Sequence, residues 1–178
     1  TELKNNGEED LGVEYVSSFA LLGIDKEGLL STDEKLEVLI ARNAWQKELI
    51  WNRFSMDQLG MSISQPDKVR RSSQTISVGN TGNWSTKNYL PMGCLKNKET
   101  DSILFWQIEQ NGSWYWEISD QDGHMYLQLS GPTEHQSHWW KNLKPGDTFA
   151  SVPVSVGSAC GDVEEAAGEL TKYRRAIR

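Results

Sequence analysis

Apolar and polar side chains alternate one by one through the centre of the chain, which is the period of a half-buried β-strand. Three such runs follow one another between residues 103 and 130. Asn111-Gly112 separates the first two runs and Asp122-Gly123 the last two, and both dipeptides favour tight hairpin turns. The pattern predicts a three-stranded antiparallel meander with a type I′ turn at Asn111-Gly112. Its apolar face would carry Leu104, Trp106, Ile108, Trp114, Trp116, Ile118, Met125, Leu127 and Leu129.

Further strand-like runs lie towards both ends of the chain. Val13–Leu22 and Thr148–Val156 are rich in β-branched, aromatic and aliphatic residues, and Leu143–Thr148 contains the Pro-Gly pair of a turn. The stretch Glu34–Phe54 is ambiguous, because its Glu, Lys, Leu and Ala content favours a helix while its apolar residues from Leu36 onward alternate as in a strand. We interpret this stretch as strand.

The C-terminal residues change to helical periodicity. Asp162 and Glu165 match a capping box, and apolar residues then recur three or four positions apart, so we expect a helix over Asp162–Arg178. The predicted fold is all-β, with an antiparallel β-sandwich over residues 1–161 and a C-terminal α-helix over residues 162–178. The chain begins without Met and ends on this helix, and we expect it to be a segment of a longer protein.

Charge and composition narrow the classes of partner. The formal net charge is −7 and the pI is near 5.0, which disfavours nucleic acid and anionic membranes. The pairs Arg70-Arg71 and Arg174-Arg175 are short, and we interpret them as solvated charges or local ion pairs. No apolar stretch reaches the length of a membrane span, and the N-terminus lacks a hydrophobic signal region. Cys94 and Cys160 form no CxxC pair, so we expect reduced thiols and a cytoplasmic protein.

No motif for catalysis or metal binding stands out. His135 and His138 have a spacing that could share a metal on a helix, but the flanking proline and tryptophans favour a loop or a strand, where the two rings would face apart. We therefore expect no metal and no cofactor. The sequence also lacks an activated serine or cysteine nucleophile. Glu109 and Glu117 stand on the polar faces of their predicted strands, and we interpret them as solvated charges.

The chain contains eight tryptophans, and aromatic faces are common platforms for sugar rings. Carbohydrate is therefore the first ligand class to consider, with core packing as the alternative. The alternation of the central runs assigns Trp106, Trp114 and Trp116 to the core. Trp84 stands instead in the polar loop Asn83–Tyr89, where it either anchors the loop in the core or offers an exposed stacking surface. Trp84 is thus the candidate substrate-binding residue.

Five blocks of the sequence occur in one order and spacing that resemble a known family. They are Val13–Ala20, Leu39–Glu48, Gly79–Thr86 with Tyr89–Pro91, Phe105–Trp114 and His138–Phe149. The chain resembles, over nearly its whole length, the N-terminal β-supersandwich domain of glycoside hydrolase family 36 α-galactosidases. The resemblance begins partway into that domain, and its specificity rests on the common order of blocks that are individually short.

The resemblance implies a parent enzyme in which this β-domain precedes a linking helix, a (β/α)8 barrel and a small C-terminal β-domain. Such enzymes remove terminal α-D-galactosyl residues with retention, using two aspartates on the barrel. The Lys-aromatic-Asp run around the family's nucleophile is missing here, so the resemblance assigns no catalytic residue to this chain. We expect a noncatalytic domain of a bacterial α-galactosidase, with residues 162–178 leading towards the barrel.

Two other functions stay open. The chain could act as a stand-alone carbohydrate-binding module that uses exposed tryptophan and tyrosine, or as an oligomerisation domain of its parent. The resemblance implies galactosides as ligands of the parent enzyme, and its own barrel and a homo-oligomer as partners.

Overall fold

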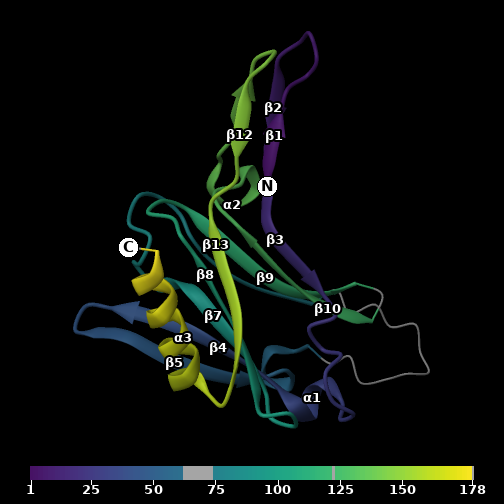
Figure 1. Cartoon of the computed structure of the whole chain (residues 1–178), viewed down its shortest axis with the longest axis vertical. Helices are drawn as coiled ribbons and strands as arrows, with labels where there is room; N and C mark the ends of the chain where they lie inside the picture. The colour runs from purple at the N-terminus through teal and green to yellow at the C-terminus, as the bar shows by residue number, and fades with distance from the viewer. Residues whose placement is uncertain (62–73, 122, 178) are drawn as a thin grey trace.

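The computed structural model describes residues 1–61, 74–121 and 123–177. Two antiparallel β-sheets face each other, a narrow arm of paired strands extends away from them, and a helix lies against the outside of one sheet (Figure 1). The predicted all-β sandwich with a C-terminal helix is confirmed. Arg70-Arg71, Asp122 and Arg178 lie outside the described residues.

In the part of the chain that the structure describes, the larger sheet contains five strands. In order across the sheet they are β13 (Val154–Cys160), β8 (Ser102–Ile108), β7 (Tyr89–Asn97), β4 (Leu36–Ala44) and β5 (Lys47–Ser55). The ambiguous stretch Glu34–Phe54 is therefore mainly strand, folded as the hairpin of β4 and β5. Its first two residues are helical, because one turn, α1 (Thr32–Lys35), precedes β4. A short 3₁₀ helix, η1 (Asp57–Leu59), follows β5.

Within the described residues, the smaller sheet contains four strands. In order they are β3 (Ser17–Leu22), β10 (His124–Ser130), β9 (Trp114–Gln121) and β6 (Thr75–Asn80). Strands β9 and β10 form the predicted hairpin, in which Gly123 has a φ of 79°. A positive φ carries little steric cost at glycine, so this residue suits the turn.

The predicted meander is wrong at its first turn. Strands β8 and β9 do not pair but belong to opposite sheets, and residues 109–113 carry the chain from one sheet to the other. Neither Asn111 nor Gly112 has a positive φ, so the expected type I′ turn is also absent. The physical reason is burial: each strand has a row of large apolar side chains, and facing sheets let the two rows cover each other.

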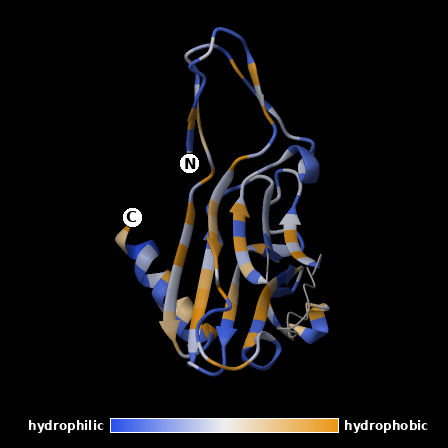
Figure 2. Ribbon diagram, turned by 90° about the vertical axis from the view of Figure 1, so that its right-hand side faces the viewer, coloured by the Kyte–Doolittle hydropathy of each residue, from blue (hydrophilic) through white to orange (hydrophobic). Residues whose placement is uncertain are grey.

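The interior between the sheets holds the central tryptophans. Trp106, Trp114 and Trp116 are almost fully buried, which confirms their assignment to the core. The alternation also predicted the buried row of β10, formed by Met125, Leu127 and Leu129. Figure 2 shows hydrophobic stretches concentrated on the strands of the two sheets.

Helix α3 (Val163–Ala176) covers the outer face of the larger sheet. Asp162 and Glu165 form the predicted capping box at its start. Ala166 and Leu170 belong to a second apolar cluster with Phe105, which explains why β8 is buried on both faces. Within the described residues, no helix is long and apolar enough to cross a membrane.

The arm consists of two short antiparallel pairs. Strand β1 (Glu2–Lys4) pairs with β12 (Thr148–Ala150), and β2 (Leu11–Val13) pairs with β11 (Lys141–Leu143). The two end runs predicted as single strands are therefore each divided between the arm and a sheet, the first into β2 and β3 and the second into β12 and β13.

A buried asparagine holds the two pairs of the arm together. The Asn5 side-chain amide donates hydrogen bonds to the carbonyl oxygens of Glu9 and Leu143, at 2.8 and 2.9 Å. The Asn5 N–H donates to the carbonyl of Asp147 at 3.0 Å, across the turn predicted from the Pro-Gly pair. Gly146 in that turn has a φ of 87°. These bonds satisfy a polar side chain that would otherwise be costly to bury.

Candidate functional site

Trp84 is exposed on the segment between β6 and β7, with 62% of its surface accessible. Another tryptophan anchors that segment, because the indole N–H of Trp114 donates to the Ser85 carbonyl at 2.7 Å. The Asn80 side-chain amide fixes the backbone of Trp84 itself, donating to its carbonyl at 2.8 Å. Of the two alternatives for Trp84, the structure supports the exposed one. A contact between Trp84 and substrate stays a prediction.

Asn43 ties the Trp84 segment to the end of β4. Its side-chain amide donates to the Thr86 carbonyl at 2.6 Å, and its backbone N–H donates to the Asn88 carbonyl at 2.9 Å. A hollow of about 550 Å³ opens beside these bonds, and Trp84 is not among its lining residues. We call it the Arg42 hollow; its lining residues are Arg42, Asn43, Ala44, Lys47, Ile50, Asn52, Asn88 and Tyr89.

Arg42 and Tyr89 form the most specific contact in this hollow. The guanidinium carbon lies 5.3 Å from the ring centroid of Tyr89, and Nη2 donates to the phenol oxygen at 3.2 Å. The two residues are cross-strand partners on β4 and β7. With the neighbouring asparagine amides, they offer hydrogen-bond donors and an aromatic ring. The arrangement is suited to binding a polar ligand.

Trp45 stands at the same end of the molecule, at the turn between β4 and β5, and is 87% exposed. Its neighbours Ala44 and Lys47 line the Arg42 hollow. Sequence reasoning named Tyr89 only as an aromatic residue of the polar loop, and it did not single out Arg42 or Trp45. The sequence does show polar residues clustered at the end of an apolar strand, which could have indicated a site. Arg42 and Tyr89 come together, however, only because β4 pairs with β7, and these strands are far apart in sequence.

The two histidines lie at a short helix, α2 (Glu134–Ser137), and not in the loop or strand that we expected. The Thr133 hydroxyl caps this helix by accepting from the Gln136 N–H at 3.0 Å, which explains why the turn forms. His138 ends it with a φ of 52°. Nδ1 of His138 is 3.9 Å from a carboxylate oxygen of Glu134. Within residues 1–61, 74–121 and 123–177, no three His, Cys, Asp or Glu side chains gather as a metal site would require.

The two glutamates interpreted as solvated charges are half-buried and hydrogen-bonded. Glu109 accepts from the Tyr173 hydroxyl at 2.8 Å and from the Ser155 hydroxyl. Glu117 accepts from the hydroxyls of Tyr115 and Tyr126 at 2.5 and 2.9 Å. That interpretation was therefore wrong. Tyr173 and Tyr126 lie on other elements, so the strand pattern does not reveal them as donors, whereas Tyr115 stands two residues before Glu117 on the same strand. Both carboxylates act as structural acceptors.

Solved structures of α-galactosidases contain the same fold. AgaA from Geobacillus stearothermophilus, of glycoside hydrolase family 36, matches with a TM-score of 0.70 and 14% identity over 92% of this chain and 20% of its own. The α-galactosidase from Lactobacillus brevis matches with a TM-score of 0.69 and 15% identity, over 93% of this chain and 20% of its own. The galactosidase domain of the α-galactosidase-sucrose kinase AgaSK matches with a TM-score of 0.67 and 19% identity, over 89% of this chain and 19% of its own. The chain has an α-galactosidase domain fold.

The chain spans about one fifth of the length of these α-galactosidases. No protein-family model and no curated protein sequence matches it. The resemblance to family 36 α-galactosidases, inferred from five short blocks, is thus confirmed by the fold. Variants of the α-galactosidase AgaA have been solved with raffinose and with stachyose.

Proposed function

We propose that the chain is a noncatalytic β-sandwich domain of an α-galactosidase. The parent enzyme hydrolyses terminal α-D-galactosyl residues with retention, at aspartates on a separate barrel. The supporting observation is the fold shared with α-galactosidases over 89–93% of the chain. In this proposal residues 1–161 are part of a larger β-domain, and residues 162–178 link it to the barrel.

The exposed end near Trp84 is the part of the domain that we propose to contact galactosides. Trp84 and Trp45 offer stacking faces, and the Arg42 hollow offers amide and guanidinium donors for hydroxyl groups. This surface would help to shape the sugar pocket of the parent. The parent enzyme would be a cytoplasmic bacterial protein and could assemble as a homo-oligomer, which sedimentation velocity with and without this domain tests.

Two measurements test the domain proposal. The purified chain should not release nitrophenol from an aryl α-galactoside, and turnover that persists through further purification would contradict a noncatalytic role. The reading frame beyond Arg178 should encode a (β/α)8 barrel with a Lys-aromatic-Asp run. A different domain or a stop codon at that point would overturn the assignment to an α-galactosidase.

A stand-alone carbohydrate-binding module is the second candidate, and the exposure of Trp84 favours it. Such a module would bind galactosides without its parent. Titration of the chain with raffinose should then change the tryptophan fluorescence, and Trp84→Ala should abolish the change. Trp140→Ala is the matched control, because Trp140 is similarly exposed but lies beside the arm. A flat titration of the unmodified chain would exclude this candidate.

A further inference from the structure

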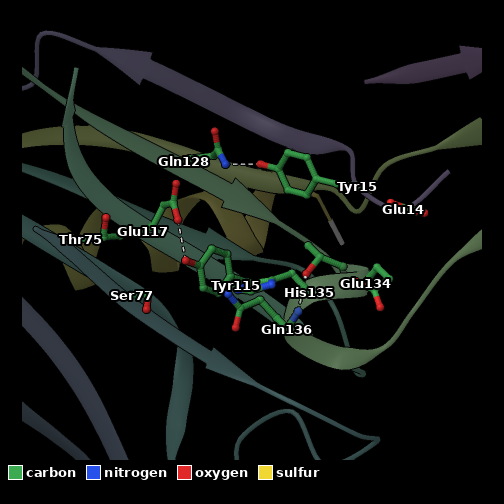
Figure 3. Close-up of a pocket in the computed structure, with 11 residues that line it drawn as sticks. Glu14, Tyr15, Thr75, Ser77, Tyr115, Glu117, Gln128, Glu134, His135 and Gln136 are labelled. Atoms are coloured by element: carbon green, nitrogen blue, oxygen red, sulfur yellow. Dashed lines mark hydrogen bonds between the residues drawn. The ribbon is translucent and has the colours of Figure 1, made fainter. Parts of the chain in front are cut away.

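A second hollow, of about 540 Å³, lies on the outer face of the smaller sheet, away from the core (Figure 3). Strands β6, β9 and β10 form its floor, and α2 and the segment before β3 form its side. This volume is within the usual range for small-molecule sites. We call it the tyrosine hollow; it is lined by Glu14, Tyr15, Thr75, Ser77, Tyr115, Glu117, Gln128, Thr133, Glu134, His135 and Gln136.

The floor of the tyrosine hollow is organised around Glu117. Its two carboxylate oxygens accept from the phenols of Tyr115 and Tyr126, which belong to neighbouring strands. Gln128 and Ser77 are the cross-strand partners of Glu117 on its two sides. Burial and the Glu117 carboxylate raise the pKa of both tyrosines, so the phenols stay protonated and keep donating.

Tyr15 forms the opposite side of the hollow. The side-chain amide of Gln128 donates to its hydroxyl, and Figure 3 shows the Tyr15 ring held apart from the ring of Tyr115. Burial, followed by the nearby Glu117 carboxylate, raises the pKa of Tyr15 to about 12. Opposite Tyr115, the cross-strand partner is Gly79, which has no side chain to compete for space on this face. Two aromatic rings are thus fixed in place before any ligand arrives, which lowers the entropic cost of binding.

The charges around the tyrosine hollow select the class of ligand. Among the residues that the structure describes, no lysine or arginine lines the hollow, and its carboxylates would repel an anion. Glu14 and Glu134 are exposed, so water and salt screen their attraction for a cation. Glu117 already uses both oxygens in hydrogen bonds. The remaining polar groups are hydroxyls, amides and the exposed imidazole of His135, and groups of these kinds can donate and accept hydrogen bonds, as a polyhydroxyl ligand requires.

We propose that the tyrosine hollow binds a neutral saccharide. The sugar ring would lie against Tyr15 or Tyr115, and its hydroxyls would bond to Gln128, Gln136 and Ser77. This site is separate from the Trp84 surface and does not depend on the proposed function of the domain. It gives the fold a second place to hold sugar.

Titration of the ¹⁵N-labelled chain with raffinose, followed by NMR, tests the proposal. We expect saturable shifts at the amides of β9, β10 and α2. Tyr15→Ala removes one ring from a segment outside the strands and should weaken binding at least tenfold. Gln136→Trp adds bulk at an exposed position of α2 and should block the hollow, giving a second variant should Tyr15→Ala disturb the fold. Trp140→Ala should bind normally.

Several outcomes would overturn the proposal. One is that raffinose shifts no resonance around the hollow. Another is that putrescine binds there while raffinose does not. Binding that survives Tyr15→Ala and Gln136→Trp but is lost in Trp84→Ala would place the saccharide at the other surface. The assignment to an α-galactosidase is tested separately, by the sequence beyond Arg178. If that assignment fails, the outcome of this titration is unaffected.

Discussion

Trp106 of β8 and Trp116 of β9 meet edge to face across the interior of the sandwich. Their ring centroids are 5.2 Å apart and their planes are inclined by 77°. Such tilted pairs are favourable because the positive edge of one ring meets the negative face of the other. The contact joins the two sheets directly, at the point where the sequence pattern alone suggested neighbouring strands.

Truncation of this pair should be among the most damaging changes to the fold. Trp116→Ala removes a fully buried ring and leaves a cavity between the sheets, so we expect the free energy of unfolding to fall by about 3–5 kcal/mol. Urea denaturation followed by circular dichroism measures it. Trp45→Ala is the control, with an expected effect within about 0.5 kcal/mol because Trp45 is exposed. Equal losses in the two variants would contradict the packing described.

The same substitution should have opposite effects at two glycines. A Cβ at Gly93 would lie 2.5 Å from Cζ2 of Trp106, which is fully buried and cannot move aside. Gly93→Ala should therefore destabilise the chain by about 1–3 kcal/mol. A Cβ at Gly168, in α3, meets nothing within 4 Å, so Gly168→Ala should stabilise by up to about 1 kcal/mol through helix propensity. Thermal unfolding of both variants measures whether each substitution raises or lowers the stability. A loss of stability in Gly168→Ala would refute the argument.

Burial of individual side chains was predicted more accurately from the sequence than the pairing of the strands. Alternation identified Trp106, Trp116 and Leu127 correctly, because the two-residue period of a strand is a local property. It failed at the β8–β9 connection, since consecutive strands usually neighbour one another and nothing local distinguishes a hairpin from a crossing between sheets. Phe105, on the face opposite Trp106, is buried as well, because a helix more than fifty residues later in the chain covers it.

The candidate sites depended even more on long-range contacts. Exposure of Trp84 could not be read from its polar loop, because the anchor is the indole of Trp114 on another strand. Arg42 meets Tyr89 only through the register of β4 against β7. The hydrogen bonds to Glu117 likewise come from a neighbouring strand as well as its own. Residues with reactive or hydrogen-bonding side chains could be recognised in the sequence. The residues that they contact could not, because strand pairing determines which side chains meet.

Stability should decline at acid pH through the cap of α3. Burial raises the pKa of the Asp162 carboxyl, but hydrogen bonds from the Arg53 guanidinium at 2.6 Å and the Val163 N–H at 2.7 Å outweigh it, and the pKa lies below its ordinary value. This stabilisation is fully present above the unfolded pKa of about 3.9 and is lost as the pH falls through the folded pKa. Asp162→Ala should cost about 1 kcal/mol at neutral pH, measured by urea denaturation.

A second variant separates the charge of Asp162 from its capping bond. Asp162→Asn keeps an oxygen that can cap the helix but cannot ionise. We expect it to be less destabilised than Asp162→Ala at neutral pH. It should approach the unmodified chain as the pH falls below about 3.9 and through the lower pKa of the folded carboxyl, where Asp162 itself becomes protonated. A stability difference between the unmodified chain and Asp162→Ala that stays constant across this range would contradict the pKa argument.

The two cysteines should differ sharply in reactivity. Cys94 is 2% exposed beneath α3, and burial raises the pKa of its thiol to about 12, whereas Cys160 is exposed at the end of β13. Because the thiolate is the reacting species, an aromatic disulfide reagent should label one cysteine of the native chain promptly and the second only on unfolding. Cys160→Ser should remove the prompt phase and Cys94→Ser should leave it. Prompt labelling of both thiols would mean that α3 does not stay closed over the sheet, since slow labelling of Cys94 requires local opening at that helix.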